Sequence, residues 1–468
     1  MNPNRAIEIS IQLAFVLLVA IVAFTSGGLL DTGDGIAHYQ IARFSWSHPE
    51  LFLHHWGKPL FTLLSSPFAQ IGFNGMITFN LICAALTGYY LLKLSKSFSI
   101  ERAWVALLCL FCTPIYYHVV LGGMTEVAFA LFLTAGLYYL LNGQMAMGAI
   151  ILSFLPYLRP EAYIIIPIYG LFILVKDYKL LPLFLTGTLI YSLAGLIAFE
   201  DFFWYLTQDP YSNKDPSFYG SGSPWRFIYQ TKNINGLVLA FFFLVGSIWK
   251  VKDTLSIGER SQQYFWWFIF IPVLAVYIVH SILWWKGLKG SAGLIRVIAS
   301  VAPLIALVSA IGIERVIGMF VSKRHKLLIG AFCSLLVIIV FVDRVDFRIK
   351  FKEKEKLAVE AAQWTRENYP EMKIFYLEPL VSFSIDLDPY DETISSKLWH
   401  LDREVPSKSA NSGDLILWDS HYGPVEASLP LESLQNDEDL EFIRTFLPEP
   451  PILIFGNRYY ELHLFRKK

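Results

Sequence analysis

The chain has 468 residues, of which 55% are hydrophobic and only 16% charged, and its mean hydropathy is +0.47. About a quarter of the residues of a typical soluble domain are charged, so this composition excludes an ordinary soluble protein. The 38 basic and 39 acidic side chains leave no positive excess that would bind nucleic acid. All four cysteines lie in apolar stretches, which indicates small hydrophobic side chains rather than disulfides or a zinc site.

The apolar runs predict a polytopic α-helical membrane protein. A hydrocarbon layer about 30 Å thick needs roughly 20 helical residues. Charged breaks in the hydropathy divide the chain into about eleven spans. The fifth and sixth are short and flank Arg159-Pro160-Glu161, so they form either two crossings or one broken hairpin. The predicted spans lie near 8–30, 76–95, 103–119, 124–142, 145–158, 161–175, 180–200, 233–249, 263–285, 293–318 and 326–343.

The distribution of Lys and Arg over the loops predicts the orientation. Cations gather in alternate short loops, which is typical of the cytoplasmic side, and this places the N-terminus in the cytoplasm. The first span lacks a cleavage site and should remain as an anchor. No Asn-x-Ser/Thr triplet occurs, which favours a bacterial plasma (inner) membrane. The loops expected outside are 31–75, 119–124, 201–232 and 286–292.

The last part of the chain has a different composition and predicts a small extracytoplasmic α/β domain. We therefore divide the chain into a membrane domain, 1–343, and a C-terminal domain, 344–468. In the second, 354–366 and 431–446 have helical patterns. Strand-like runs occur at 373–379, 414–419, 451–456 and 459–465.

The first outer loop carries the most informative residues. Asp31 and Asp34 follow the first span directly, where two carboxylates can point the same way on a turn. A carboxylate at the membrane face can act as a general base or hold a cation. Alternatively, both residues cap the following helix, a position that Asp favours. The spacing leaves both readings open.

The same loop later combines imidazoles, an indole and a cation. Phosphate groups are bound by compact cations and N–H donors, and sugar rings pack on aromatic faces. An interfacial belt that only anchors the loop is the alternative. The residues concerned are His54, His55, Trp56 and Lys58.

These residues resemble a known pattern. Tyr39 and Arg43 belong to a Tyr-x-x-Ala-Arg sequence after Asp34, and Lys58 begins a Lys-Pro-Leu turn. The pattern resembles the GT-C membrane glycosyltransferases, in particular the protein O-mannosyltransferases, the lipid A aminoarabinose transferases and the dolichyl-phosphate-mannose mannosyltransferases. It departs from them in that Gly35 replaces the second acid of the usual pair, the aromatic residue is displaced by one position and one proline is missing. The many spans, long first outer loop and outer end domain resemble the same class.

The resemblance implies transfer of a sugar, mannose or another hexose, from a polyprenyl-phosphate carrier to a hydroxyl of a glycan, lipid or protein acceptor. The reaction would occur on the outer face of the membrane and invert the anomeric configuration. It implies Asp34, with Asp31 as the second choice, as the base that takes the acceptor proton. It also implies that Tyr39 and Arg43 contact the substrate.

Charged residues in the membrane part are further candidates, because a charge there is costly unless it is paired or used. Glu126 lies at the outer edge of a span and is a candidate contact for the acceptor sugar. Arg159 and Glu161 are either substrate contacts or a structural ion pair. Arg296 could hold the carrier phosphate or reach the interface with its end group. Lys286 and Lys289 flank a Gly-rich turn just before it.

Two other functions fit a multi-span chain with interior cations. A transporter or flippase of lipid-linked sugars would be expected to show repeated halves, and the sequence has none. A ligase of whole glycan chains differs mainly in its substrates. No cofactor is firmly implied. A divalent cation at the two aspartates is the alternative, but a single base suffices, so we expect metal-independence and no metal ligands.

Overall fold

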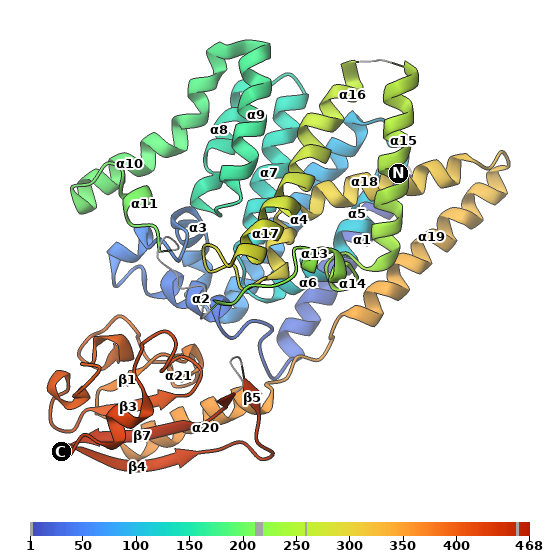
Figure 1. Ribbon diagram of the computed structural model, residues 1–468. Coiled ribbons are helices and arrows are strands. Elements are labelled where there is room, and N and C mark those ends of the chain that lie inside the picture. Colours follow the sequence, from blue (N-terminus) through green and yellow to red (C-terminus); the bar gives the residue numbers. More distant parts are fainter. Residues whose placement is uncertain (1–2, 211–218, 258–259, 455–457) are drawn as a thin grey trace. The chain divides into compact units, whose positions relative to one another are not determined.

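The chain folds into two compact units in the computed structural model, which describes residues 3–210, 219–257, 260–454 and 458–468 (Figure 1). The helical unit consists of Met1–Thr25 and Phe52–Arg348. The sheet unit consists of Ser26–Leu51 and Ile349–Lys468. The sheet unit is thus built from two parts of the chain that are far apart in sequence.

The helical unit contains α-helices of very different lengths, joined by short irregular helices. The α-helices are α1 (Pro3–Thr25), α3 (Pro59–Ala69), α4 (Phe73–Ser97), α5 (Ala103–Phe111), α6 (Pro114–Leu121), α7 (Glu126–Leu141), α8 (Met145–Ser153), α9 (Ala162–Asp177), α10 (Thr186–Phe199), α11 (Trp204–Thr207), α13 (Arg226–Tyr229), α14 (Thr231–Ile234), α15 (Leu237–Ile257), α16 (Arg260–Phe265), α17 (Ile271–Lys286), α18 (Ala302–Gly318) and α19 (Lys323–Arg344). The irregular ones are η2 (Leu155–Tyr157), η3 (Tyr178–Leu185), η4 (Trp266–Phe270) and η5 (Ile295–Val301).

The helical unit confirms the prediction that the chain is a multi-pass membrane protein. Among the described residues, six helical stretches are long and apolar enough to span a membrane, or up to seven if the bent pair α5 and α6 counts as one span. The sequence predicts about eleven spans. The difference arises partly because α7 has 16 residues and α8 only 9, and because Ala162–Phe199 is one stretch of 38 residues where two spans were predicted.

The candidate spans differ in how much of their surface is buried inside the protein, which distinguishes central from peripheral helices. The most apolar window of Ile295–Gly318 is 94% buried, whereas that of Asn4–Thr25 is 17% buried and that of Lys323–Arg344 is 22% buried. The central stretch ends in α18, which packs closely on α15. A Cβ on Gly312 would lie 2.0 Å from the Phe242 carbonyl oxygen, so the missing side chain lets the two backbones approach.

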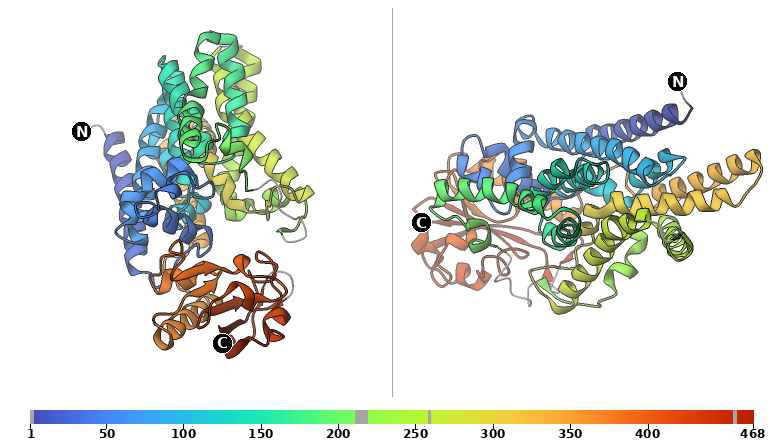
Figure 2. Two further views of the ribbon diagram at one scale, coloured as in Figure 1. Left: turned by 90° about the vertical axis from the view of Figure 1, so that its left-hand side faces the viewer. Right: turned by 90° about the horizontal axis from the view of Figure 1, so that it is seen from above.

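The sheet unit holds one five-stranded mixed sheet in the order β2-β1-β3-β7-β4. The pairs β1–β2 and β1–β3 are parallel, and β7 runs antiparallel to both β3 and β4. Helix α20 lies along one face of the sheet (Figure 2), and its apolar side chains pack there. The elements are α20 (Glu353–Asn368), β1 (Ile374–Tyr376), α21 (Pro379–Ser384), β2 (Ser395–Lys397), η6 (Leu398–His400), η7 (Pro406–Ser409), β3 (Leu415–Asp419), α22 (Leu431–Gln435), β4 (Leu440–Phe446), the hairpin β5 (Leu453–Ile454) and β6 (Arg458–Tyr459), and β7 (Leu462–Lys467).

The mixed sheet and helix α20 confirm the prediction that the C-terminal part of the chain is an α/β domain. One predicted element of this domain is wrong. The predicted helix at 431–446 is only α22, which ends at Gln435, and the rest forms β4. The reason is that Leu440–Phe446 pairs with β7 at the sheet edge, which overrides the local helical pattern. Of the strand predicted at 451–456, residues 455 and 456 lie outside the described residues.

The segment Ser26–Leu51 belongs to the sheet unit because its side chains pack there. Ile36, on α2 (Asp34–Phe44), is fully buried with Ala358 and Leu380. The Gly27 amide donates to the Ile349 carbonyl at 3.0 Å. A short helix, η1 (Pro49–Leu53), follows α2. The first part of the predicted outer loop is therefore structured and fixed by the C-terminal part of the chain.

Candidate functional site

The turn before α2 gives the two aspartates different surroundings. The Asp31 Oδ1 accepts hydrogen bonds from the amides of Gly33, at 3.2 Å, and Gly35, at 2.9 Å. Asp31 therefore caps the turn at the start of α2. Asp34 is the first residue of that helix and is half-buried. A carboxylate in this position is stabilised by the helix dipole. The capping interpretation therefore applies to Asp31.

Residues farther along α2 join it to the C-terminal part of the sheet unit. The Arg43 guanidinium forms an ion pair with Asp386, with Nη2 3.1 Å from Oδ2, and Nη1 donates to the Tyr39 hydroxyl at 2.9 Å. Burial raises the pKa of Tyr39, so its hydroxyl is protonated. On the same helix, Gln40 donates to Ser382 at 2.8 Å. These contacts fix the orientation of α2 and of the aspartate at its start.

The helical unit contains a separate cluster of buried charges around Arg159. Its guanidinium lies 2.8 Å from the fully buried Glu126 and donates two hydrogen bonds of 3.0 Å to Glu161. Nη1 also donates to the Thr125 hydroxyl at 2.9 Å. The structure thus brings together three of the predicted site residues. The bidentate pair fits the structural interpretation of Arg159 and Glu161, and Glu126 extends it into a network.

Arg296 and His280 complete this cluster. The Nε of Arg296 lies 3.6 Å from the same Glu126 oxygen that contacts Arg159, and Nε2 of His280 lies 3.4 Å from Glu161. Arg296 stands at the start of η5, and 18% of its side chain is exposed, the most of these charged groups. Two guanidinium groups and two carboxylates therefore balance each other's charge in this cluster.

Lys58 lies near the same cluster and has an unusual environment. It is 3% exposed, its Nζ donates to the His55 carbonyl at 3.2 Å, and its φ of 62° is rare for a residue with a side chain. Burial and, to a smaller extent, the charge of Arg159 lower the pKa of Lys58, whereas Glu161 and Asp209 raise it, and together these effects bring it to about 7. Its amine therefore changes charge near neutral pH.

His55 connects Lys58 with the segment after α10. Its ring stacks on Tyr205 at 4.1 Å between centroids, and its Nε2 lies 2.9 Å from the Tyr205 carbonyl oxygen. Burial lowers the pKa of the His55 imidazole, which favours its neutral form. The described part of the predicted outer loop 201–232 thus packs against the Lys58 turn. Residues 211–218 lie outside the described residues.

The remaining predicted residues have other contacts. His54 is exposed and accepts a hydrogen bond from the Gly57 amide at 3.3 Å, and Trp56 is half-buried. Lys286 stacks on Trp285, with 3.8 Å from Nζ to the ring centroid. Lys289 pairs with Asp209 at 2.8 Å.

Sequence reasoning missed His280 and the partners of α2. His280 was detectable because an imidazole inside the apolar stretch of α17 is an ionisable group at membrane depth. The partner of Arg43 was not detectable, since Asp386 is 343 residues away in the chain. In the described part of the chain, no group of three or more His, Cys, Asp or Glu side chains is arranged to hold a metal ion.

The chain has the GT-C fold, as the sequence resemblance predicts. The chain is similar to the crystal structure of ArnT from Cupriavidus metallidurans bound to undecaprenyl phosphate, with 12% identity, a TM-score of 0.57 and 97% of both chains covered. For the same enzyme in the apo state the identity is 11%, the TM-score 0.59 and the coverage 98% of this chain and 97% of that one.

A third similar structure is the apo form of the oligosaccharyltransferase of Archaeoglobus fulgidus. It is 13% identical with a TM-score of 0.58, and the match covers 90% of this chain and 70% of that one. Both relatives are GT-C membrane glycosyltransferases. No known sequence family and no curated protein sequence matches the chain.

Proposed function

We propose that the chain is a membrane glycosyltransferase that moves a hexose from a polyprenyl-phosphate carrier to an acceptor hydroxyl on the outer face of a plasma membrane. The observation that carries this proposal is the match over 97% of both chains to a structure that holds undecaprenyl phosphate. In this proposal residues 1–343 form the transferase domain, with about eleven crossings when the short helices are included. Residues 344–468 form an extracytoplasmic domain.

The proposed reaction needs a base, and Asp34 is the residue that we assign to it. The acceptor oxygen attacks the anomeric carbon from the face opposite the phosphate. Its proton passes to the Asp34 carboxylate, the bond between the anomeric carbon and the phosphate oxygen breaks, and the configuration inverts. Asp31 keeps its carboxylate on the turn amides, and Tyr39 and Arg43 hold α2 in place.

The leaving phosphate needs positive charge, which the Arg159 cluster and Lys58 supply. Arg159 is already neutralised by Glu126 and Glu161, so its main role is to hold Glu126 against Arg296. Arg296 and Lys58 are the cations that we assign to the carrier phosphate, because Arg296 is the most exposed charged group of the cluster and Lys58 adds a positive charge near it. Mannose or another hexose is the proposed sugar, and the base chemistry needs no metal.

The test is transfer of label by the purified full-length chain in detergent. Polyprenyl-phosphate hexose with a radiolabelled sugar is incubated with a cell-envelope extract, and a parallel tube contains EDTA. We expect transfer by the wild type and transfer at least about a hundredfold slower by Asp34→Asn, because an amide cannot accept the proton. Asp402→Asn is the matched control, since Asp402 is an exposed turn cap of the sheet unit whose amide analogue can still accept hydrogen bonds.

The outcomes separate the alternatives. Transfer by Asp34→Asn at the wild-type rate would rule out its role as base. Label that stays on the carrier with every variant would favour a transporter or flippase, which a flipping assay then examines. Transfer of preassembled glycan chains but not of single hexoses would favour a ligase. Loss of activity with EDTA would replace metal-independence by a divalent-cation requirement.

A further inference from the structure

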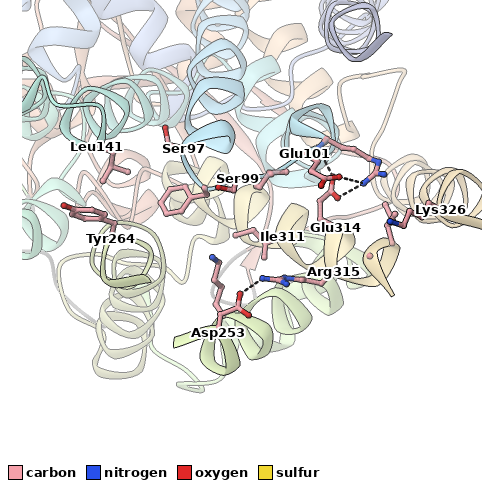
Figure 3. A pocket seen from close by; sticks show the side chains of 16 residues that line it. Ser97, Ser99, Glu101, Leu141, Asp253, Tyr264, Ile311, Glu314, Arg315 and Lys326 are labelled. Carbon is pink, nitrogen blue, oxygen red and sulfur yellow. Dashed lines mark hydrogen bonds and ion pairs between the residues drawn. The ribbon is translucent and has the colours of Figure 1, made fainter. Parts of the chain in front are cut away.

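A pocket of about 630 Å³ lies at one end of the helical unit (Figure 3). Its walls come from the end of α4 and residues 98–102 after it, from α7, α15, α16 and α18, and from the first turns of α19. Ligand pockets typically have volumes of about 300 to 1,000 Å³, so this pocket is large enough for a phosphate-bearing group. Its lining is mostly polar and charged, unlike a gap between apolar helices.

The pocket is distinct from the Arg159 cluster, because the same helices carry the two at opposite ends. Helix α7 has Glu126 at its first residue and Leu141, which lines the pocket, at its last. At about 1.5 Å per residue these positions are separated by roughly 22 Å along the axis. Likewise, the stretch that starts with Arg296 in η5 ends with Glu314 and Arg315 in α18.

Two ion pairs in the wall are satisfied internally. Arg102 contacts Glu314 with 2.7 Å between Nη1 and Oε2, and its backbone amide donates to Oε1 at 2.9 Å. Arg315 pairs with Asp253 on the facing helix. Figure 3 shows Glu314 and the pair of Arg315 and Asp253 at the wall. These pairs fix the pocket walls and neutralise the two carboxylates that are only 14% exposed.

Over the whole lining, four basic side chains stand against three carboxylates, which leaves a positive excess of one. The basic residues are Arg102, Lys250, Arg315 and Lys326, and the acidic ones are Glu101, Asp253 and Glu314. The Glu101 side chain is 84% exposed, so solvent screens its charge. Lys250 is only 8% exposed, with its Nζ 5.4 Å from the Phe265 ring centroid. Lys326 stands in the first turns of α19, where the helix dipole also favours an anion.

We propose that this pocket binds a phosphate group through Lys250 and Lys326. The group belongs either to the headgroup of an anionic phospholipid or to a soluble phosphate compound. An ammonium group is compact and well hydrated and binds phosphate as a point charge, which suits two lysines facing one cavity. This site is independent of the sugar transfer proposed above.

The experiment measures binding to the full-length protein in two arms. One arm uses lipid nanodiscs with phosphatidylglycerol in phosphatidylcholine, compared with phosphatidylcholine alone, and counts retained phosphatidylglycerol by native mass spectrometry. The other uses equilibrium dialysis with radiolabelled inorganic phosphate. The variants are Lys250→Gln and Lys326→Gln. Lys252→Gln is the matched control, because Lys252 is exposed on the same helix and does not line the pocket.

We expect each pocket variant to weaken binding about tenfold, the effect of losing about 1.4 kcal/mol of interaction with a charged group. The control should bind as the wild type does. Binding only in the first arm identifies a lipid headgroup, and binding in both identifies phosphate itself. Lys326→Gln keeps the test decisive if Lys250→Gln fails to fold, because Lys326 is half-buried. No binding in either arm, or equal binding by all variants, would overturn the proposal.

Discussion

At the scale of single residues, burial makes the charge of Lys58 sensitive to pH near neutrality. Burial lowers its pKa from 10.5 to about 7, so the amine is charged below that pH and neutral above it. If Lys58 binds the carrier phosphate, affinity for the carrier should fall as the pH rises through about 7. The measurement is the KM for polyprenyl-phosphate hexose between about pH 6 and pH 8.

Lys58→Arg is the variant that separates this effect from other titrations. A guanidinium keeps its charge at all these pH values, so the KM should lose its dependence on pH near 7. Lys286→Arg is the control, because Lys286 is exposed on Trp285 and lies outside the Arg159 network. A KM profile that is the same for Lys58→Arg and the wild type would remove Lys58 from phosphate binding.

The turn before α2 gives a second residue-scale prediction. Asparagine caps a turn about as well as aspartate, so Asp31→Asn should keep most of the activity, whereas Asp31→Ala should destabilise the turn by about 1 kcal/mol. Loss of a general base typically costs about 10² to 10⁴ in rate, which is the effect expected at Asp34. The initial transfer rates of Asp31→Asn, Asp31→Ala and Asp34→Asn test whether Asp34→Asn is the slowest of the three. Equal losses for Asp31→Asn and Asp34→Asn would mean that both carboxylates take part in catalysis.

The same residues show what sequence can and cannot predict about the candidate site. Both aspartates were visible as candidates, but only the backbone shows that the Asp31 oxygen faces the amides of Gly33 and Gly35. The pairing of Arg159 with Glu161 follows from their proximity in sequence. Their link through Glu126 to Arg296 depends on how α7, η5 and the turn before α9 pack, and no local spacing encodes it.

At the scale of elements, the packing of α15 on α18 depends on two glycines. A Cβ on Gly246 would lie 2.2 Å from the Val308 carbonyl oxygen, and one on Gly312 would lie 2.0 Å from that of Phe242. Neither backbone oxygen can move without shifting a helix. We expect Gly312→Ala to destabilise the helical unit by about 1 to 3 kcal/mol, the usual effect of overpacking.

Thermal unfolding of the full chain in detergent measures this effect. Gly318→Ala is the control, since a Cβ there has nothing within 4 Å and the residue is exposed at the end of the same helix. Its midpoint should equal or slightly exceed that of the wild type, because alanine favours a helix more than glycine does. If Gly312→Ala melts at the wild-type temperature, the close approach of these helices does not limit stability.

Elements were predicted well where the local pattern and the tertiary packing agree. The amphipathic pattern at 354–366 and the apolar runs of α1 and α19 correspond to observed helices. The 431–446 prediction failed because pairing with β7 determines the structure of β4. The short helices α5 and α6 bend by 62° at a break that a hydropathy window averages over.

At the scale of the whole molecule, the chain leaves the sheet unit after Leu51 and returns to it at Ile349. Hydropathy assigns residues 31–75 to one outer loop, since it reports only which residues lie outside the membrane. It does not report that Ile36 shares a buried core with Ala358 and Leu380. The helix that carries the proposed base therefore depends on residues more than 300 positions later in the chain.

This dependence gives a prediction for a chain that ends at Arg348. Without residues 349–468, Ile36 loses its buried contacts and Arg43 loses Asp386, so α2 has neither a core nor an ion-pair partner to hold it. An isolated helix of 11 residues is marginal in water, and the Asp34 segment should become disordered. Hydrogen exchange over 31–51 should reach the unprotected rate, and sugar transfer should be lost. The full-length Asp386→Ala variant, which removes one contact and keeps the core, should retain protection over α2 and much of the transfer. Protection of 31–51 in the shortened chain would show that α2 folds without its C-terminal partners.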